Sequence, residues 1–339
     1  MKAIRVPQPG QLVLDEIPMP SAPAGDEVMI RICAAGICGS DIHILHGQNP
    51  FATFPRTLGH EVAGVIEAVG EEVKDLKVGD HVVVDNVISC GHCYACRTGR
   101  HNVCRELKAL GVHTDGGFME HFNITSKNVY KIDESIPLTH AALAEPYSIA
   151  FQCADRGRLV KDDMVLICGA GPIGLLLLEV CKLVGAKVAI MDTVDARLDV
   201  AASFGADLLL NPKTCDVKQE LMQFTDGEGC SLIFEATGNV HVFESCIRDY
   251  PSQAGRVVVV GFPNVPASIV PADIMKRELD ILGSRVNNYM FPKVVECMEK
   301  GIIHPNRVVS HILPMDRAEE AFELFATCPQ KVMKVVLTF

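Results

Sequence analysis

The feature that most restricts the fold is the glycine pattern at residues 169–174, because of the segments on either side of it. An apolar run of strand length, Met164–Cys168, ends directly before the pattern, and an apolar run of helix length begins at Ile173. In such a unit the first glycine permits a tight turn, the second lets a pyrophosphate approach the backbone, and the third lets helix and strand pack closely. The free N–H groups at the helix start favour phosphate. The pattern predicts a dinucleotide-binding turn, and a glycine-rich turn without a ligand is the alternative.

Strand-length and helix-length apolar segments alternate from about residue 150 to residue 283. This alternation predicts an α/β domain with a doubly wound parallel sheet. Residues 1–149 contain short β-rich runs between Gly and Pro turns, which predict a small barrel or sandwich. Residues 284–339 contain two helical segments and a closing strand, and we expect them to return to the first domain.

Asp192 ends the strand that follows the glycine-rich helix, at the spacing of an acid that binds a ribose diol. A carboxylate there would repel a 2′-phosphate, which favours NAD over NADP. Arg197, five residues on, has two interpretations. Its guanidinium could bind that phosphate, or it could be a surface cation that stacks on adenine.

Four cysteines in the segment 89–105 have the spacing of a structural zinc site: Cys90, Cys93, Cys96 and Cys104. Neighbouring Cys-x-x-Cys thiols reach one tetrahedral ion more easily than they join distant segments, so disulfides are the weaker alternative. The segment lacks apolar periodicity, and we expect a metal ion to order it. With fourteen cysteines and no export signal in the chain, the expected compartment is the reducing cytoplasm.

A second set of metal-ligating types lies near the ends of expected strands. Cys38, His60 and Glu61 offer one thiolate, one imidazole and one carboxylate. Taken singly, they could be a core thiol, a buried hydrogen-bonded ring and a solvated charge. Together, and beside a cysteine lobe and a dinucleotide turn, they predict a catalytic zinc with an open coordination position.

Composition excludes several classes of partner. A chain of 339 residues with 48% hydrophobic residues can form two domains with ample core. The net charge of −11 and the absence of a basic stretch interleaved with aromatics exclude nucleic acid. No segment has the length of a membrane span or the pattern of a signal peptide. We therefore expect a globular enzyme with a small-molecule substrate.

These motifs, in this order and spacing, resemble the zinc-containing medium-chain dehydrogenases, in the branch of the sorbitol and threonine dehydrogenases. The resemblance runs essentially end to end, and beyond the cysteine and glycine motifs it rests on residues 36–43, 58–61, 79–82, 116–118, 145–146 and 236–238. It implies a GroES-like β-barrel catalytic domain into which a Rossmann domain is inserted, and a homodimer or homotetramer. In the dimeric members Rossmann sheets join edge to edge, which would place the strand around Ile281 at the interface.

The resemblance also assigns roles to residues. Cys38 and His60 would ligate the catalytic zinc, and Glu61 and Glu145 would reach it directly or through water. The alcohol-dehydrogenase branch has a cysteine where Glu145 stands. Ser40 would take the hydroxyl proton and His43 would pass it to solvent; turn capping and surface packing are the respective alternatives. The residues implied to contact the cofactor are Gly169, Gly171, Pro172, Ile173, Gly174, Asp192, Arg197, Thr237, Gly261 and Arg285.

Residues 47–51, 110–117 and 283–285 most resemble bacterial sugar-acid dehydrogenases of the L-galactonate/L-gulonate 5-dehydrogenase and starvation-sensing type. The expected reaction is NAD-dependent oxidation of a secondary hydroxyl of a sugar acid or polyol. Arg285 could pair with a substrate carboxylate, and His113 could bind substrate hydroxyls or only its own loop. A polyol or threonine dehydrogenase is one alternative. The others are a non-catalytic cofactor-sensing regulator, against which the complete ligand set argues, and a zinc-independent quinone reductase, against which both zinc motifs argue.

Overall fold

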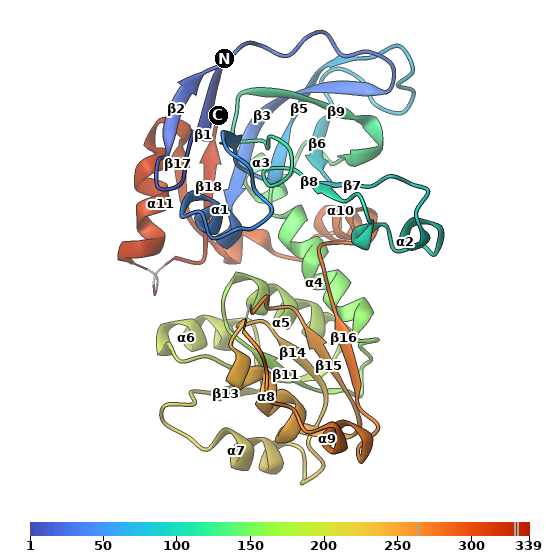
Figure 1. The fold of residues 1–339 in the computed structure, drawn as a ribbon, viewed down its shortest axis with the longest axis vertical. Coiled ribbons are helices and arrows are strands. Elements are labelled where there is room, and N and C mark those ends of the chain that lie inside the picture. The colour runs from blue at the N-terminus through green and yellow to red at the C-terminus, as the bar shows by residue number, and fades with distance from the viewer. Residues whose placement is uncertain (264, 329, 331) are drawn as a thin grey trace. The chain divides into compact units, whose positions relative to one another are not determined.

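The computed structural model describes residues 1–263, 265–328, 330 and 332–339, which form two compact units (Figure 1). The first unit comprises Met1–Ser148 and Asn287–Phe339, and the second comprises Ile149–Val286. The chain therefore leaves the first unit once and later returns to it.

The first unit is built mainly from β-strands (Figure 1). They are β1 (Lys2–Val6), β2 (Val13–Glu16), β3 (Glu27–Ile37), β4 (Arg56–Thr57), β5 (Glu61–Val69), β6 (His81–Val84), β7 (Val87–Ile88), β8 (Lys108–Ala109), β9 (His121–Thr125), β10 (Val129–Lys131), β17 (Val309–Pro314) and β18 (Lys334–Thr338). The α-helices of this unit are α1 (Gly39–Leu45), α2 (Tyr94–Arg97), α3 (Leu138–Ala141), α10 (Phe291–Glu299) and α11 (Ala318–Thr327). Single 3-10 turns lie at His101–Val103, Ser126–Asn128, Pro305–Arg307 and Met315–Arg317.

The largest sheet of the first unit has the order β10-β6-β5-β3-β18-β17, and β9 also pairs with β3. The last strand, β18, runs antiparallel to β3 and sets Val335 opposite Ile37. Figure 1 shows this red C-terminal strand beside the blue β3. The C-terminal segment thus contributes two strands, β17 and β18, to this sheet. Valine and isoleucine side chains from β3 and β5 form the core with Phe118.

The second unit has a six-stranded sheet, all parallel, with the order β13-β12-β11-β14-β15-β16. Its strands are β11 (Met164–Cys168), β12 (Lys187–Met191), β13 (Leu208–Leu210), β14 (Cys230–Glu235), β15 (Pro251–Val259) and β16 (Asp280–Gly283). Counted within the unit, the order is 3-2-1-4-5-6, which is that of the doubly wound dinucleotide-binding fold. The predicted fold class is confirmed, and the switch point between β11 and β14 is where such sheets bind ligands.

Helix α4 (Ala144–Arg156), whose first residues belong to the first unit, precedes these strands. The helices between the strands are α5 (Pro172–Val184), α6 (Asp195–Ser203), α7 (Val217–Phe224), α8 (Val240–Arg248) and α9 (Pro271–Met275). Helix α5 begins with Pro172, and Gly185, which directly follows its last residue, has a left-handed φ of 91°. Both residues are favoured at those positions, so local chemistry sets the helix bounds. Among the described residues, no helix is both long enough and apolar enough to span a bilayer.

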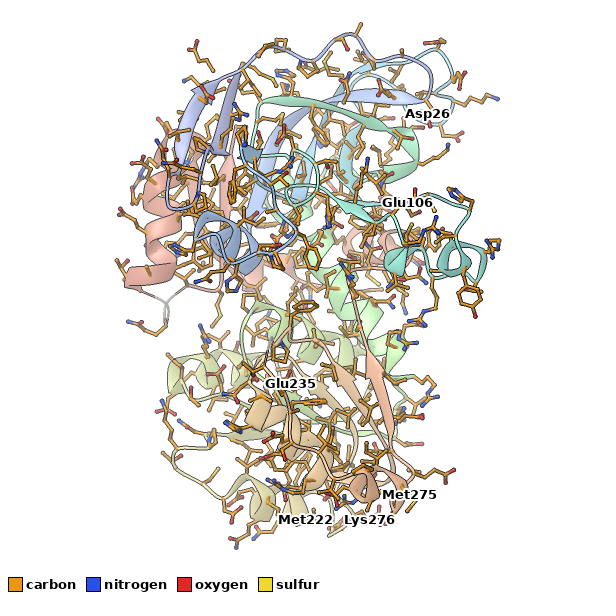
Figure 2. All side chains as sticks on the ribbon, in the orientation of Figure 1. Asp26, Glu106, Met222, Glu235, Met275 and Lys276 are labelled. Carbon is orange, nitrogen blue, oxygen red and sulfur yellow. The ribbon has the colours of Figure 1, made fainter. Side chains whose placement is uncertain are left out.

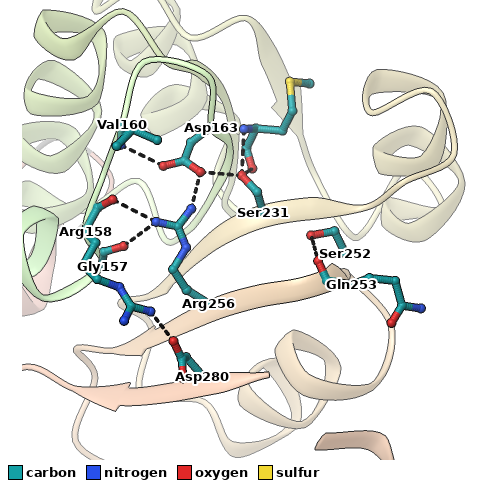
Figure 3. A network of polar contacts seen from close by, with 10 residues as sticks. Gly157, Arg158, Val160, Asp163, Ser231, Ser252, Gln253, Arg256 and Asp280 are labelled. Carbon is teal, nitrogen blue, oxygen red and sulfur yellow. Dashed lines mark hydrogen bonds and ion pairs between the residues drawn. The ribbon is translucent and has the colours of Figure 1, made fainter. Parts of the chain in front are cut away.

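A polar network fixes the loop before β11 to strands β14 and β15 (Figure 3). The carboxylate of Asp163 forms an ion pair with Arg256 of β15 and accepts a hydrogen bond of 2.7 Å from the Ser231 hydroxyl of β14. Arg256 also donates to the carbonyl oxygens of Gly157 at 2.7 Å and Arg158 at 2.9 Å. The guanidinium therefore satisfies loop carbonyls and a buried charge together.

Candidate metal and cofactor sites

Three ligating side chains meet where β3 ends and β5 begins. The β3–β5 ladder sets Gly36 opposite Glu61, so Cys38, two residues past Gly36, comes beside His60. One ligand atom from each of Cys38, His60 and Glu61 lies within 4.8 Å of the others. The structure thus brings together the thiolate, imidazole and carboxylate that the sequence singled out.

Two glycines make room for this group. A Cβ on Gly36 would lie 1.9 Å from Oε2 of Glu61, so only glycine lets that carboxylate lie against β3. Gly59 has a φ of +91°, and a Cβ there would lie 2.2 Å from the ring of Phe118. Both positions exclude larger residues on steric grounds, and the second turns the chain so that His60 follows in the site.

Asp41 ties the two ligand-bearing segments together. Its buried carboxylate accepts hydrogen bonds from the N–H of Cys38 at 2.9 Å and of Gly59 at 3.2 Å. Its Oδ1 lies 3.7 Å from Nδ1 of His60. Burial lowers the pKa of His60, but Asp41, Cys38 and Glu145 outweigh that effect and raise this pKa well above 6.5. The 3.7 Å distance is longer than a hydrogen bond, so Asp41 acts on the imidazole through its charge.

A buried lysine holds Glu61 from the other side. Lys334 of β18 forms an ion pair with Oε1 of Glu61 and donates to the carbonyl of Ile37 at 3.2 Å. Burial lowers the pKa of Lys334, but Glu61, Cys38 and Glu145 together outweigh that effect and raise this pKa above 10.5. Among the described residues, Oε2 of Glu61 is buried without a hydrogen-bond partner. An unpartnered buried carboxylate oxygen is costly, and a cation would satisfy it, so the donor set fits a zinc ion.

Glu145 lies in the first turn of α4 and is buried. Its Oε1 accepts a hydrogen bond of 3.0 Å from the side-chain amide of Asn86. Burial raises the pKa of Glu145 to about 7. Glu145 is outside the group of three whose ligand atoms lie within 4.8 Å, but its charge acts on His60. It is therefore close enough to influence that group without being one of its members.

The two predicted relay residues lie on α1, directly after Cys38. His43 is exposed, and its Nδ1 lies 2.9 Å from Oε1 of Gln48. Ser40 is half-buried. His113 accepts a hydrogen bond of 3.1 Å from the N–H of Ala109, which agrees with the loop-binding alternative for that residue. The relay itself stays a prediction.

The four cysteines of the lobe converge, and no disulfide joins them. The Sγ–Sγ distances are 3.5 Å for Cys93–Cys96, 3.4 Å for Cys90–Cys104 and 3.9 Å for Cys93–Cys104. Metal–sulfur bonds of zinc length give tetrahedral edges of about 3.8 Å, whereas a disulfide requires about 2.0 Å. The sulfur positions therefore fit one zinc ion.

Backbone donors surround these sulfurs. The N–H groups of Cys90 and Glu106 each donate to Sγ of Cys104 at 3.3 Å, and Figure 2 labels Glu106. Hydrogen bonds from backbone N–H groups, of which that of Arg105 has the largest effect, lower the pKa of the Cys93 thiol to about 6. Donors of this kind favour the thiolate form that a metal requires.

The second unit has a cavity of about 350 Å³. It lies where β11, β12 and β14 end, at the switch point of the sheet. Five residues predicted from the glycine motif and the resemblance line it: Gly169, Gly171, Asp192, Arg197 and Thr237. Pro172, Ile173 and Gly174 form the start of α5 instead. Among the described lining residues, Gly261 and Arg285 do not appear, so their cofactor role stays a prediction.

The glycine turn has the geometry that its sequence predicted. Gly169 has a φ of +103°, and a Cβ on Gly174 would lie 1.9 Å from the carbonyl oxygen of Gly169. A Cβ on Gly171 would meet nothing within 4 Å, so the space over this residue is open. The first glycine is needed for its left-handed φ and the third for close packing, whereas the second leaves room for a ligand.

Asp192 contributes to the turn as well as to the cavity. Its carboxylate accepts hydrogen bonds from the N–H of Ala170 at 2.9 Å and of Val194 at 3.0 Å. The guanidinium of Arg197 lies 3.7 Å from Oδ2 of Asp192. The two candidate ribose-binding side chains therefore form one pair.

Sequence reasoning assigned no role to Asp41, Lys334, Asn86 and Glu235. Glu235, labelled in Figure 2, accepts from the N–H groups of Thr237 at 2.8 Å and Gly238 at 3.1 Å, and so shapes the cavity wall. Asp41 lies three residues after the candidate ligand Cys38, and this short spacing could have identified it from the sequence. Lys334 and Asn86 are far from their partners in the sequence and had none.

The comparisons with known proteins agree with both sites. The chain matches the family described as "Alcohol dehydrogenase GroES-like domain" over residues 24–134 and the family described as "Zinc-binding dehydrogenase" over residues 172–300. It belongs to the zinc-binding dehydrogenases that have a GroES-like domain, which confirms the resemblance, and it is an oxidoreductase that acts on CH–OH groups.

Particular relatives are similar over their full length. The chain is 40% identical to the starvation-sensing protein RspB of Escherichia coli K12, covering 100% of this chain and 99% of RspB. It is 34% identical to L-galactonate-5-dehydrogenase of the same strain, with the same coverage. A crystal structure of the RspB alcohol dehydrogenase from E. coli CFT073, complexed with NADH, is 38% identical, covers 100% and 99% of the two chains, and has a TM-score of 0.95.

Proposed function

We propose that this protein is a zinc- and NAD-dependent dehydrogenase that oxidises a secondary hydroxyl of a sugar acid or polyol, of the L-gulonate/L-galactonate 5-dehydrogenase type. The observation that carries the proposal is the group formed by Cys38, His60 and Glu61, whose ligand atoms lie within 4.8 Å of one another. A thiolate, an imidazole and a carboxylate with an open position are typical of catalytic zinc.

In this proposal Cys38 and His60 hold the catalytic zinc, and Glu61 or Glu145 completes its shell. Bound zinc supplies a Lewis acid that lowers the pKa of a substrate hydroxyl. Asp41 ties the segments of Cys38 and Gly59 together, and Lys334 holds one oxygen of Glu61 while the other stays free for a ligand. The four cysteines of the lobe hold a second, structural zinc.

The cavity of the second unit is the proposed NAD site. NAD supplies the hydride acceptor. Gly171 leaves the turn open to the pyrophosphate, and the α5 N-terminus offers N–H groups to it. Asp192 accepts the hydrogen bonds of the adenine ribose and disfavours a 2′-phosphate. Its ion pair with Arg197 leaves that guanidinium less available to a phosphate.

The hydroxyl proton needs a path to solvent, and α1 offers one. Ser40 is proposed to accept the proton, and His43 to pass it on. If Gln48 Oε1 accepts from the N–H at Nδ1 of His43, Nε2 is the ring atom that takes the proton. His43 is exposed, which suits its exchange with solvent.

The similarity to L-galactonate-5-dehydrogenase supports a polyhydroxylated acid as substrate. Arg285 is the proposed partner of the substrate carboxylate. A polyol or threonine dehydrogenase is the second candidate. The name of RspB, a starvation-sensing protein, is the observation that keeps a cofactor-sensing regulator as a third. We also propose a cytoplasmic homodimer or homotetramer that uses β16, an edge strand whose Ile281 is partly exposed.

Steady-state rates with aldonates, pentitols, threonine and unbranched primary alcohols, each with NAD and with NADP, test the proposal. We expect the highest kcat/KM with an aldonate and NAD, and two zinc ions per chain by elemental analysis. Activity confined to primary alcohols would refute the polyhydroxyl substrate. A chain that holds one zinc and turns over none of the substrates would favour the regulator.

A further inference from the structure

The two-residue loop between β6 and β7, Asp85 and Asn86, is fixed by hydrogen bonds to its backbone and to that of Val87, the first residue of β7. The carboxylate of Asp85 accepts a hydrogen bond of 2.9 Å from the N–H of Val87. The amide of Asn128 donates to the carbonyls of Asp85 and Val87, at 2.8 Å each. The N–H of Leu110 donates to the carbonyl of Asn86 at 3.1 Å. The Asn86 side chain therefore projects from a rigid support.

Asn86 reaches Glu145 from this loop. Its Nδ2 donates to Oε1 of Glu145 at 3.0 Å, and both side chains are buried. A flipped amide would set Oδ1 against a carboxylate oxygen, so the contact defines the amide orientation. Among the described residues, Oδ1 of Asn86 is buried without a hydrogen-bond partner.

An unpartnered buried amide oxygen costs about 1–3 kcal/mol. Other buried amide oxygens of the described residues, that of Asn287 among them, also have no hydrogen-bond partner, so the partner of the amide nitrogen is what distinguishes Asn86. The one hydrogen bond that Asn86 makes from its side chain to a described residue goes to Glu145. The side chain of Asn86 therefore acts on the carboxylate of Glu145.

We infer that Asn86 is a positioning residue that sets the placement of the Glu145 carboxylate toward the catalytic metal. The inference rests on the proposed function, in which Glu145 serves that metal together with Cys38 and His60. The amide occupies Oε1 and leaves Oε2 as the oxygen for the metal or for a water molecule bound to it. Hydrogen-bond partners of ligands fix their orientation, and their loss costs about 10- to 100-fold in metal affinity or activity.

The test measures metal binding in the full-length protein, with both sites loaded. Asn86→Ala removes the donor, and Asn86→Asp removes it while keeping the side-chain volume. We expect both variants to bind catalytic-site zinc about 10- to 100-fold more weakly in chelator competition. With Co²⁺ in the catalytic site, we expect the visible bands to shift. The zinc of the cysteine lobe should remain bound. Asn86→Asp serves as the test if Asn86→Ala does not fold.

Asn287→Ala is the matched control. Asn287 is also buried, and its Nδ2 donates to Oδ1 of Asp85 at 3.0 Å, so the variant removes an amide from the same network without touching Glu145. We expect it to lower stability and leave the cobalt spectrum unchanged. In a Glu145→Gln background, Asn86→Ala should cause no further loss of metal affinity, because the coupled partner is already altered.

The two possible failures can be told apart. If the wild-type protein holds two zinc ions and both Asn86 variants keep its metal affinity and cobalt spectrum, the inference is overturned and the proposed function stands. Equal spectral changes in the Asn287→Ala control would also overturn the inference, since they would show a general effect of the network. If the wild-type protein holds only the zinc of the cysteine lobe, the proposed function itself fails.

Discussion

Lys334 and Glu61 form a buried ion pair across 273 residues of sequence. The pair joins the last strand of the chain to the segment that bears the candidate zinc ligands. It exists because β18 pairs with β3, and β3 pairs with β5. The C-terminal segment therefore supports the candidate metal site and also adds β17 and β18 to the sheet.

Loss of the Lys334 ammonium should destabilise the protein. Lys334→Met leaves the Glu61 carboxylate buried without its cation, and we expect the free energy of unfolding to fall by about 3–5 kcal/mol. Lys300→Met is the control, because Lys300 and Glu296 form an exposed pair that should contribute less than about 1 kcal/mol. Urea unfolding of both variants measures the difference. Equal losses would contradict a special role for the buried pair.

The network in Figure 3 allows the same comparison between a buried and an exposed ion pair in the second unit. Arg256→Met leaves Asp163 buried without a cation, and we expect a loss of about 3–5 kcal/mol. Arg158→Met breaks only the pair with Asp280, whose side chains are 60% and 52% exposed, and should cost less than about 1 kcal/mol. Thermal and urea unfolding test this. A tolerated Arg256→Met would show that the loop carbonyls find other donors.

Substitutions of Gly171 and Gly174 in the turn should have different effects on stability and on NAD binding. Gly174→Ala places a Cβ against the Gly169 carbonyl, so we expect it to lower the melting temperature and NAD binding together. Gly171→Ala meets open space and should leave stability within about 0.5 kcal/mol while it weakens NAD binding. Calorimetric NAD titration beside thermal unfolding separates the two. Unchanged NAD affinity in Gly171→Ala would argue against pyrophosphate at this residue.

We expect Asp80 to account for part of the stability that the protein loses at acid pH. Its buried carboxylate accepts from Lys131 at 2.6 Å and from the N–H of Lys77 at 3.0 Å. Burial raises the pKa of Asp80, but these donors outweigh it and hold the pKa below 3.8. A depressed folded-state pKa gives stability that is present above pH 3.8 and is lost as the pH falls through the folded value. Asp80→Asn should therefore be less stable at pH 7 and show a flatter acid dependence in urea unfolding; parallel pH curves would contradict this.

The sequence by itself determined the features that depend on short-range geometry. The spacing of the four cysteines identified a set of thiols that converge on one point. The glycine turn between β11 and α5, and the alternation after it, defined the parallel sheet of the second unit. Such patterns can be recognised from the sequence because the sterics of a turn, the ends of a helix and the spacing of metal ligands involve residues that are close in the chain.

Only the tertiary structure decided which distant side chains complete the sites. Lys334 reaches Glu61 through the register of three strands, and Asn86 reaches Glu145 from a loop fixed by hydrogen bonds. The Arg256–Asp163 pair joins elements 93 residues apart. These contacts depend on strand pairing and on the burial of charge, and neither leaves a periodic or spaced signal around the residue concerned.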